Sequence, residues 1–250
     1  MQTKVKLYLT SSPCGDYRCG EPDYPGLNPA NGLLEELYRD WPEDAKVLLV
    51  SAEPEDAEGN DSMMEYFSEK LEASGLPVGW LDLCDTRTVD EQLQDLPLYD
   101  VIIFGGGHVP TANAFIMEHG FDRLLQDFGG IIMGISAGTM NCAETVYSIP
   151  ELEGEAADPD YRRFIPGLGL TDIQVLPHYQ AVRWDVLDGQ RVIEDIACPD
   201  SFGHLFYALP DGSFILQREG RAEVHGPAYR FQDGSITPFG REGEITPLGR

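Results

Sequence analysis

The segment from Ile131 to Met140 limits the fold of this 250-residue chain more than any other. It reads Ile-Ile-Met-Gly-Ile-Ser-Ala-Gly-Thr-Met, an apolar run that ends abruptly in the pattern Gly-x-Ser-x-Gly. That pattern is typical of a strand that turns sharply into a helix and exposes the serine hydroxyl at the end of a sheet. Glycines on both sides suit the turn, which leaves little room for Cβ atoms. The segment predicts an α/β fold with Ser136 as a candidate nucleophile.

Strand-like apolar runs alternate with amphipathic segments before Ser136. Strands are expected at Val5–Leu9, Lys46–Ala52, Val78–Leu83, Val101–Phe104 and Gly130–Ile135. Helices are expected at Gly32–Trp41, at Asp61–Ser74, after a capping box at Thr88–Glu91, and over part of Phe115–Phe128. This order predicts a mostly parallel sheet flanked by helices. Ligands bind at the carboxyl ends of such strands, where both Ser136 and the glycines after Phe104 are expected.

The pattern of expected helices and strands changes after Glu144. An acidic exposed loop is expected over Ser148–Asp160, a strand at Ile173–Leu176 and a helix over Trp184–Ala197. Later strands are expected at His204–Ala208, Ser213–Gln217, Glu223–His225, Ala228–Phe231 and Ser235–Thr237. Turn residues between them predict a C-terminal antiparallel β extension, with Leu209–Gly212 as a hairpin-like turn. No repeat or clear linker interrupts the chain, so residues 1–250 are expected to form a single domain.

The formal net charge of −26 restricts the partners of the protein. The sequence has no cluster of basic residues that could bind a phosphate backbone, which argues against nucleic acid and against an anionic membrane surface as partners. No signal peptide or membrane-spanning run is visible, so a cytoplasmic location is expected, while a homodimer and a salt-adapted source stay open. Five cysteines without framework spacing indicate reduced thiols. Cys14 and Cys19 form a close pair without further ligands, so neither a metal nor a cofactor is expected.

A serine nucleophile needs a base that removes its proton and a carboxylate that orients the base. His178 is the preferred base, because it follows a strand-like run and a proline and should lie at a strand end near Ser136. His108 lies near the same edge, directly after the glycine triplet. For the other histidines a structural role is the simpler interpretation; they are His119, His204 and His225.

The carboxylate is less well determined by the sequence. Asp211 is the first candidate, since a turn between two late strands would hold it rigidly near a strand end. The competing interpretation is that Asp-Gly is common turn chemistry and Asp211 only caps its own turn. Glu151, in the acidic segment after the helix expected to follow Ser136, is the alternative candidate.

The triplet Gly105–Gly107 lacks the spacing of a phosphate-binding loop. A flexible loop beside a nucleophile can instead supply a backbone N–H to a developing oxyanion, as a second donor besides the N–H of Ala137. We therefore expect Gly106, Gly107, His108 and Ala137 to form an oxyanion and substrate loop.

Taken together and in order, these motifs resemble peptidase family S51, which includes aspartyl dipeptidases (peptidase E) and cyanophycinases. The resemblance covers residues from about 105 to 212, and the α/β half before them fits the same fold. The segments that carry it are Phe104-Gly105-Gly106-Gly107-His108, Gly134-Ile135-Ser136-Ala137-Gly138, Pro177-His178-Tyr179 and Leu209-Pro210-Asp211-Gly212.

The resemblance implies a fold similar to class I glutamine amidotransferases, with serine in place of their cysteine. It implies Ser136 as nucleophile, His178 as base and Asp211 at the position of a triad acid, with Glu151 near another acid proposed for the family. The implied activity is serine-type hydrolysis of dipeptides or short peptides through an acyl-enzyme. An N-terminal Asp on the substrate is one candidate specificity.

This chain departs from the family pattern beside the expected substrate. Peptidase E has Gly-Asn-Thr after the glycines, whereas His108 and Val109 stand here. An N-terminal Asp would also need a local cation against an acidic background, and Arg183 and Arg191 are the candidates.

Two other functions stay open at this stage. An α/β-hydrolase esterase would have the order Ser, acid, His, with His204 or His225 as its base. The third possibility is a catalytically inactive amidotransferase-like binding module.

Overall fold

The computed structural model describes residues 5–15 and 24–249. In that part of the chain the central element is an eight-stranded sheet, the large sheet. Its strands, in spatial order, are β16 (Ile245–Pro247), β13 (Arg221–His225), β12 (Phe214–Arg218), β1 (Lys6–Thr10), β5 (Ile131–Ile135), β4 (Val101–Phe104), β2 (Ala45–Val50) and β3 (Val78–Cys84). The strands from β1 to β3 in this order run parallel, whereas β12, β13 and β16 are antiparallel. The predicted mostly parallel sheet is confirmed.

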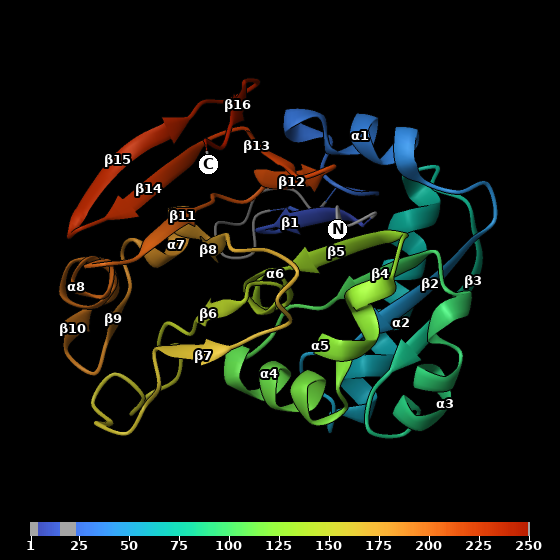
Figure 1. Cartoon of the computed structure of the whole chain (residues 1–250), viewed down its shortest axis with the longest axis horizontal. Helices are drawn as coiled ribbons and strands as arrows, with labels where there is room; N and C mark the ends of the chain where they lie inside the picture. Colours follow the sequence, from blue (N-terminus) through green and yellow to red (C-terminus); the bar gives the residue numbers. More distant parts are fainter. Residues whose placement is uncertain (1–4, 16–23, 250) are drawn as a thin grey trace.

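A second sheet, the small sheet, lies to one side of the parallel strands and is drawn in orange and red in Figure 1. It consists of β15 (Ser235–Gly240), β14 (Ala228–Gln232), β11 (Leu205–Ala208) and β8 (Gln174–Leu176), in this order. Strands β8 and β11 pair in parallel, and the others pair antiparallel. The C-terminal antiparallel extension is therefore divided between the two sheets.

Helices cover both faces of the large sheet (Figure 1). They are α1 (Leu33–Asp40), α2 (Ala57–Ala73), α3 (Val89–Gln94), α4 (Val109–Glu118), α5 (Phe121–Leu124) and α6 (Ala137–Asn141), with 3₁₀ turns at Ala30–Gly32, Leu96–Leu98 and Leu125–Asp127. Alternate strand residues point to opposite faces. Val47 and Leu49 pack with α1 and α2, whereas Leu48 and Val50 pack with α3, α4 and α5. Burial of each such side chain contributes about 1.5–3 kcal/mol.

Three helices differ from the sequence prediction in where they begin or how they are capped, and one of them is α4, which begins at Val109 rather than within Phe115–Phe128. Helix α2 begins earlier than Asp61, because the side chain of Asp56 accepts a hydrogen bond from Gly59 N and caps the helix there. The predicted capping box at Thr88 is wrong. The Thr88 hydroxyl donates to Leu83 O and accepts from Asp85 N, so it stabilises the preceding turn and makes no cap bond to α3.

The hairpin expected around Leu209–Gly212 is also wrong. Strand β11 belongs to the small sheet, whereas β12 pairs with β1 and β13 in the large sheet. The Pro-Asp-Gly sequence makes a turn as expected. Its two flanking strands take different partners, because β12 continues the large sheet beside β1. This connection therefore crosses from one sheet to the other.

The helix expected over Trp184–Ala197 is present only in its second half. The structure has a small hairpin of β9 (Val186–Leu187) and β10 (Gln190–Arg191), followed by a π-helix at Val192–Ala197 and α8 (Cys198–Asp200). Asp188 and Gly189 have φ angles of 52° and 79°, which a helix does not allow and a two-residue hairpin turn requires.

The acidic segment lies between β6 (Thr145–Tyr147) and β7 (Phe164–Pro166), which pair with each other. Residues 151–154 are exposed, as predicted, whereas Ser148, Ile149 and Ala156 are buried, so the predicted exposed loop over Ser148–Asp160 is only partly right. The carboxylate of Asp188 accepts hydrogen bonds from Gly154 N and Ala156 N, so the turn of the β9–β10 hairpin holds the acidic segment. Across residues 5–15 and 24–249, every helix falls short of the length and apolar character that crossing a bilayer requires.

Candidate active site

Ser136 lies in the sharp turn between β5 and α6 predicted from the sequence. Its φ and ψ angles of 49° and −111° are strained for a residue with a side chain. The Ser136 N–H donates to the carbonyl oxygens of Thr10 and Ser11, at 3.2 and 3.1 Å. These bonds to the end of β1 hold the strained turn in place.

The flanking glycines are required by close backbone contacts. A Cβ on Gly134 would lie 2.5 Å from Thr139 Cα, and one on Gly138 would lie 2.1 Å from Phe104 O. Real Cβ atoms do not approach backbone atoms this closely, so α6 can pack against β4 and β5 only with glycine at both positions. The pattern Gly-x-Ser-x-Gly therefore reflects the packing of the turn itself.

His178 follows β8 and lies at the end of that strand, as predicted. Its φ and ψ angles are 54° and 34°, a left-handed conformation that is uncommon for residues other than glycine. The imidazole Nε2 lies 2.8 Å from Ser136 Oγ. The His178 side chain is only 14% exposed. The distance and burial allow a direct proton transfer between the two side chains.

Asp211 completes a hydrogen-bonded chain with these two residues. Its Oδ1 lies 2.7 Å from His178 Nδ1, and its side chain is 4% exposed. The backbone N–H of Asp211 donates to Gln180 Oε1, in the helix α7 (Tyr179–Val182) that starts after His178. The structure thus brings Ser136, His178 and Asp211 together, with the carboxylate on the imidazole nitrogen opposite the serine.

Glu151 lies nearby but occupies a different position. The residue as a whole is exposed, while its carboxyl group lies beside the backbone of Val109. Removal from water raises the pKa of the Glu151 carboxyl above its ordinary value, while His108 and His178 act in the opposite direction. In the hydrogen-bonded chain, His178 Nδ1 contacts Asp211.

The glycine triplet after β4 lies against the serine. A Cβ on Gly106 would lie 3.3 Å from Ser136 Cβ. Ala137 opens α6, so its N–H belongs to the first helical turn, where no intrahelical carbonyl accepts it. The loop and the helix start are therefore adjacent to Ser136, as predicted for Gly106 and Ala137.

His108 makes contacts that sequence reasoning did not anticipate. Its N–H donates to Glu53 Oε1 at 2.8 Å, and its ring nitrogens lie 2.8 Å from Thr111 Oγ1 and from Glu155 Oε1. Glu155 also accepts hydrogen bonds from the backbone N–H groups of Glu151 and Leu152. His108 therefore joins the glycine loop to the acidic segment. Only the fold reveals this role for Glu155, because the segment has no recognisable motif.

The other candidate histidines are engaged elsewhere. His204 stacks on Phe164 with ring centroids 3.9 Å apart, and the buried His225 stacks on Phe214 at 4.3 Å. His119 ends α4 and contacts the Phe115 carbonyl. The contact with Ser136 comes from His178, so the α/β-hydrolase order with a later histidine as base does not fit this geometry.

The two arginines considered for an acidic substrate differ in their surroundings. Arg191 forms an ion pair with Asp195 at 2.7 Å, which occupies its guanidinium. Arg183 is exposed at the end of α7, with its guanidinium 4.5 Å from the Trp184 ring centroid and 5.7 Å from that of Tyr179. Arg183 is therefore the better placed of the two to meet an anionic ligand.

Metal-ligating side chains do not gather in the parts of the chain that the structure describes. Residues 5–15 and 24–249 contain no group of three or more His, Cys, Asp or Glu side chains placed to hold an ion. Cys14 is buried among apolar side chains, and Cys19 lies outside the described residues.

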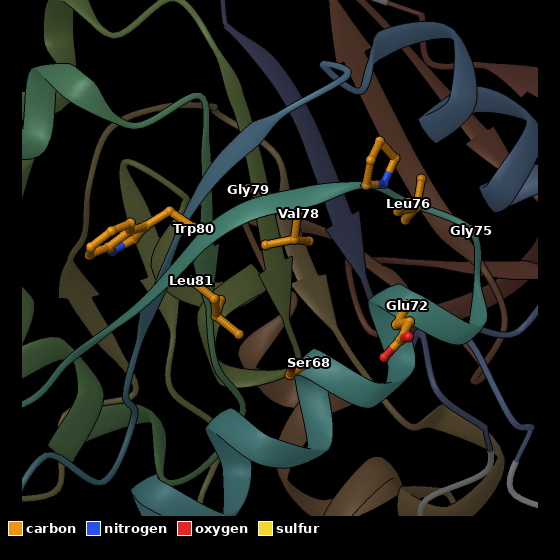
Figure 2. A pocket seen from close by; sticks show the side chains of 9 residues that line it. Ser68, Glu72, Gly75, Leu76, Val78, Gly79, Trp80 and Leu81 are labelled. Carbon is orange, nitrogen blue, oxygen red and sulfur yellow. The ribbon is translucent and has the colours of Figure 1, made fainter.

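A surface pocket lies between α2 and β3, with Glu72, Leu76 and Trp80 in its wall (Figure 2). Strands β4 and β2 separate β3 from β5, the strand that leads into Ser136. The residues of the hydrogen-bonded chain do not line this pocket. It is therefore separate from the candidate active site.

The fold and the site together define an α/β protein with a Ser–His–Asp hydrogen-bonded chain at its strand ends, an arrangement that activates a serine in hydrolases. The model of Peptidase family S51 matches residues 23–225, and the chain belongs to this family. Membership makes the protein a peptidase and therefore a hydrolase.

Solved structures show the same fold at low sequence identity. A peptidase from an acI-B1 Actinobacterium has a TM-score of 0.63 at 16% identity, over 98% of this chain and 97% of that one. A putative peptidase E protein from Listeria monocytogenes EGD-e has a TM-score of 0.60 at 17% identity, over 90% of this chain and 98% of that one. No curated protein matches the chain.

Proposed function

We propose that this protein is a serine-type peptidase that hydrolyses dipeptides or short peptides through an acyl-enzyme. The observation that carries the proposal is the position of the His178 imidazole, with Nε2 2.8 Å from Ser136 Oγ and Nδ1 2.7 Å from Asp211 Oδ1. A serine hydroxyl is a weak nucleophile until a base removes its proton, and this base is oriented by a buried carboxylate.

In the proposed reaction, His178 Nε2 takes the proton of Ser136 Oγ as the oxygen attacks the scissile carbonyl carbon. Asp211 keeps the Nδ1 proton in place and stabilises the imidazolium that forms. The Ala137 N–H and a second N–H from Gly106 or Gly107 stabilise the developing oxyanion. The imidazolium then gives its proton to the leaving amine, and the C–N bond breaks to leave the acyl-enzyme.

Water enters in the second half of the reaction. His178 accepts a proton from the water as its oxygen attacks the acyl carbon, and the same proton returns to Ser136 Oγ as the ester bond breaks. The products are the released carboxylic acid and the free enzyme. Apart from substrate and this water, the steps use only side chains and backbone groups of the described residues.

An N-terminal Asp on the substrate remains a candidate specificity, with Arg183 as the cation that would contact it. Two observations support this choice: Arg183 lies at the end of the short helix that follows His178, and Arg191 is already paired with Asp195. An ion pair between guanidinium and carboxylate would select an acidic residue.

The decisive experiment combines a covalent probe with a substrate panel. A fluorophosphonate is expected to label the wild-type protein and the control Ser68→Ala, an exposed serine on α2, but not Ser136→Ala. A dipeptide panel that varies the N-terminal residue, β-aspartyl forms included, then identifies the substrate. Labelling of Ser136→Ala at the wild-type rate would contradict the nucleophile. Labelling without any turnover would indicate a site that acylates but does not act on short peptides.

A further inference from the structure

Ser11 is a buried residue at the centre of the candidate active site that no motif marks. It directly follows β1 and is 0% exposed. In the strand order of the large sheet, β1 is the neighbour of β5, so Ser11 reaches the same sheet edge as Ser136.

Ser11 contacts all three members of the hydrogen-bonded chain. Its hydroxyl donates to Asp211 Oδ1 at 2.6 Å and accepts the backbone N–H of His178 at 2.7 Å. Its carbonyl oxygen accepts the N–H of Ser136 at 3.1 Å. One residue therefore touches the candidate nucleophile, base and acid at once.

We propose that Ser11 is a positioning residue, whose hydroxyl fixes the His178 imidazole and the Asp211 carboxylate in the geometry that activates Ser136. The proposal builds on the serine peptidase mechanism given above. Ser11 does not exchange a proton with substrate and acts only through His178 and Asp211.

The Asp211 side of this bridge orients the carboxylate. Asp211 Oδ1 accepts from both Ser11 Oγ and His178 Nδ1, and two donors on one oxygen restrict rotation of the carboxylate more than one does. A buried carboxylate also needs such donors to replace lost water. Without Ser11 Oγ, the Asp211 carboxylate has more freedom to turn away from the imidazole.

The His178 side of the bridge fixes the backbone. The left-handed conformation of His178 is unfavourable for a residue with a Cβ and persists only where neighbours hold it. The bond from His178 N to Ser11 Oγ is one such restraint. Since small displacements of reacting groups can lower rates about 100-fold, loss of this restraint should appear in the reactivity of Ser136.

The test uses the full-length protein and a fluorophosphonate probe, whose labelling rate reports Ser136 activation without knowledge of the substrate. Ser11→Ala is expected to slow labelling by about 10- to 100-fold. Ser11→Thr keeps the hydroxyl and is expected to restore most of the rate. Ser201→Ala is the matched control, because Ser201 is also 0% exposed and its hydroxyl likewise donates to one oxygen (the Cys198 carbonyl, 2.7 Å) and accepts one backbone N–H (Gly234 N, 2.8 Å).

A second readout follows the downfield proton NMR signal of His178 Nδ1–H, assigned by its loss in His178→Gln. A change in this signal in Ser11→Ala, with the signal kept in Ser201→Ala, is the expected result. Should Ser11→Ala fail to fold by circular dichroism, Ser11→Cys takes its place, since a thiol is nearly isosteric but a weak donor.

The outcomes separate the two proposals. Wild-type labelling rate together with an unchanged His178 signal in Ser11→Ala would overturn the positioning role. A Ser11→Ala rate that falls no further than that of Ser201→Ala would do the same. A wild-type protein that is not labelled at Ser136 would count against the peptidase mechanism, and the proton signal would still decide the role of Ser11.

Discussion

The carboxylate of Asp211 lies 2.7 Å from His178 Nδ1, although the two residues follow different strands of the small sheet. His178 follows β8, and Asp211 lies in the connection that leaves β11. Since β8 and β11 pair in parallel, their carboxyl ends lie side by side. This adjacency distinguishes Asp211 from Glu151, which lies in the acidic segment between β6 and β7.

Replacement of the two candidate acids should therefore have unequal effects. Asp211→Asn is expected to lower the fluorophosphonate labelling rate on the order of 10³- to 10⁴-fold, because an amide no longer holds the imidazole in the required tautomer. Glu151→Gln is expected to change the rate less than about threefold. The second-order labelling rate of each variant is the measurement. The opposite ranking would make Glu151 the acid.

The close backbone contacts in the turn around Ser136 predict that adding one methyl group there lowers the stability of the protein. Gly138→Ala is expected to lower the free energy of unfolding by about 1–3 kcal/mol or more, since the new Cβ would lie 2.1 Å from Phe104 O. Gly249→Ala is the control, because a Cβ there meets nothing within 4 Å. Urea unfolding of both variants measures the difference. Equal stability of the two would show that the turn tolerates a side chain at Gly138.

The raised pKa of Glu151 predicts how the effect of Glu151→Gln on the stability of the folded protein changes with pH. Because folding disfavours the charged form, the folded protein keeps the Glu151 proton to a higher pH than the unfolded chain does. The stability that this proton provides is present at acid pH and is lost as the pH rises through the folded-state pKa. Glu151→Gln should therefore match the wild-type melting temperature near pH 4 and exceed it near pH 7.

A series of thermal melts from about pH 4 to about pH 8 measures this effect. Glu153→Gln, from the exposed part of the same segment, is the control and should show no such trend. Parallel pH profiles for the two variants would contradict the raised pKa of Glu151.

The burial of two cysteine thiols predicts that they react slowly with alkylating reagents. Cys84 and Cys142 are 0% exposed, and burial raises the pKa of Cys84 to about 12 and the pKa of Cys142 further still. The thiolate is the reactive form, so both residues should resist iodoacetamide in the folded protein at neutral pH. Mass spectrometry of the digested protein measures the modification. The urea-unfolded protein is the positive control, and rapid modification of Cys84 before unfolding would contradict its burial.

The parallel half of the fold could be predicted from the sequence because local patterns determine it. A continuous apolar run such as Val47–Val50 in β2 predicts a strand covered by helices on both faces, and Gly-x-Ser-x-Gly reflects contacts within one strand, turn and helix. His178 was placed at a strand end by the same local logic. The assignment of catalytic roles to these residues stays a prediction that the proposed variants test.

The sequence predictions that the structure contradicts concern segments whose conformation depends on contacts with residues far away in the sequence. Pro-Asp-Gly makes the same turn whether its flanking strands pair with each other or not, and β12 lies in the large sheet because it pairs with β1 and β13. Likewise, a helix is expected over Trp184–Ala197, but the positive φ angles of Asp188 and Gly189 place a hairpin turn in its first half. Ser11 had no local signal at all, because its partners lie 167 and 200 residues further along the chain.

Asp211 lies in the connection between β11 and β12, which crosses from the small sheet to the large sheet. The assembly of the candidate site therefore depends on the folding of both sheets. Ser136 and Ser11 follow strands of the large sheet, whereas His178 follows a strand of the small sheet. Neither sheet alone contains the whole hydrogen-bonded chain. Under the proposed mechanism, a partly folded molecule in which only one sheet has formed lacks part of this chain, so peptide cleavage should begin only after both sheets have formed.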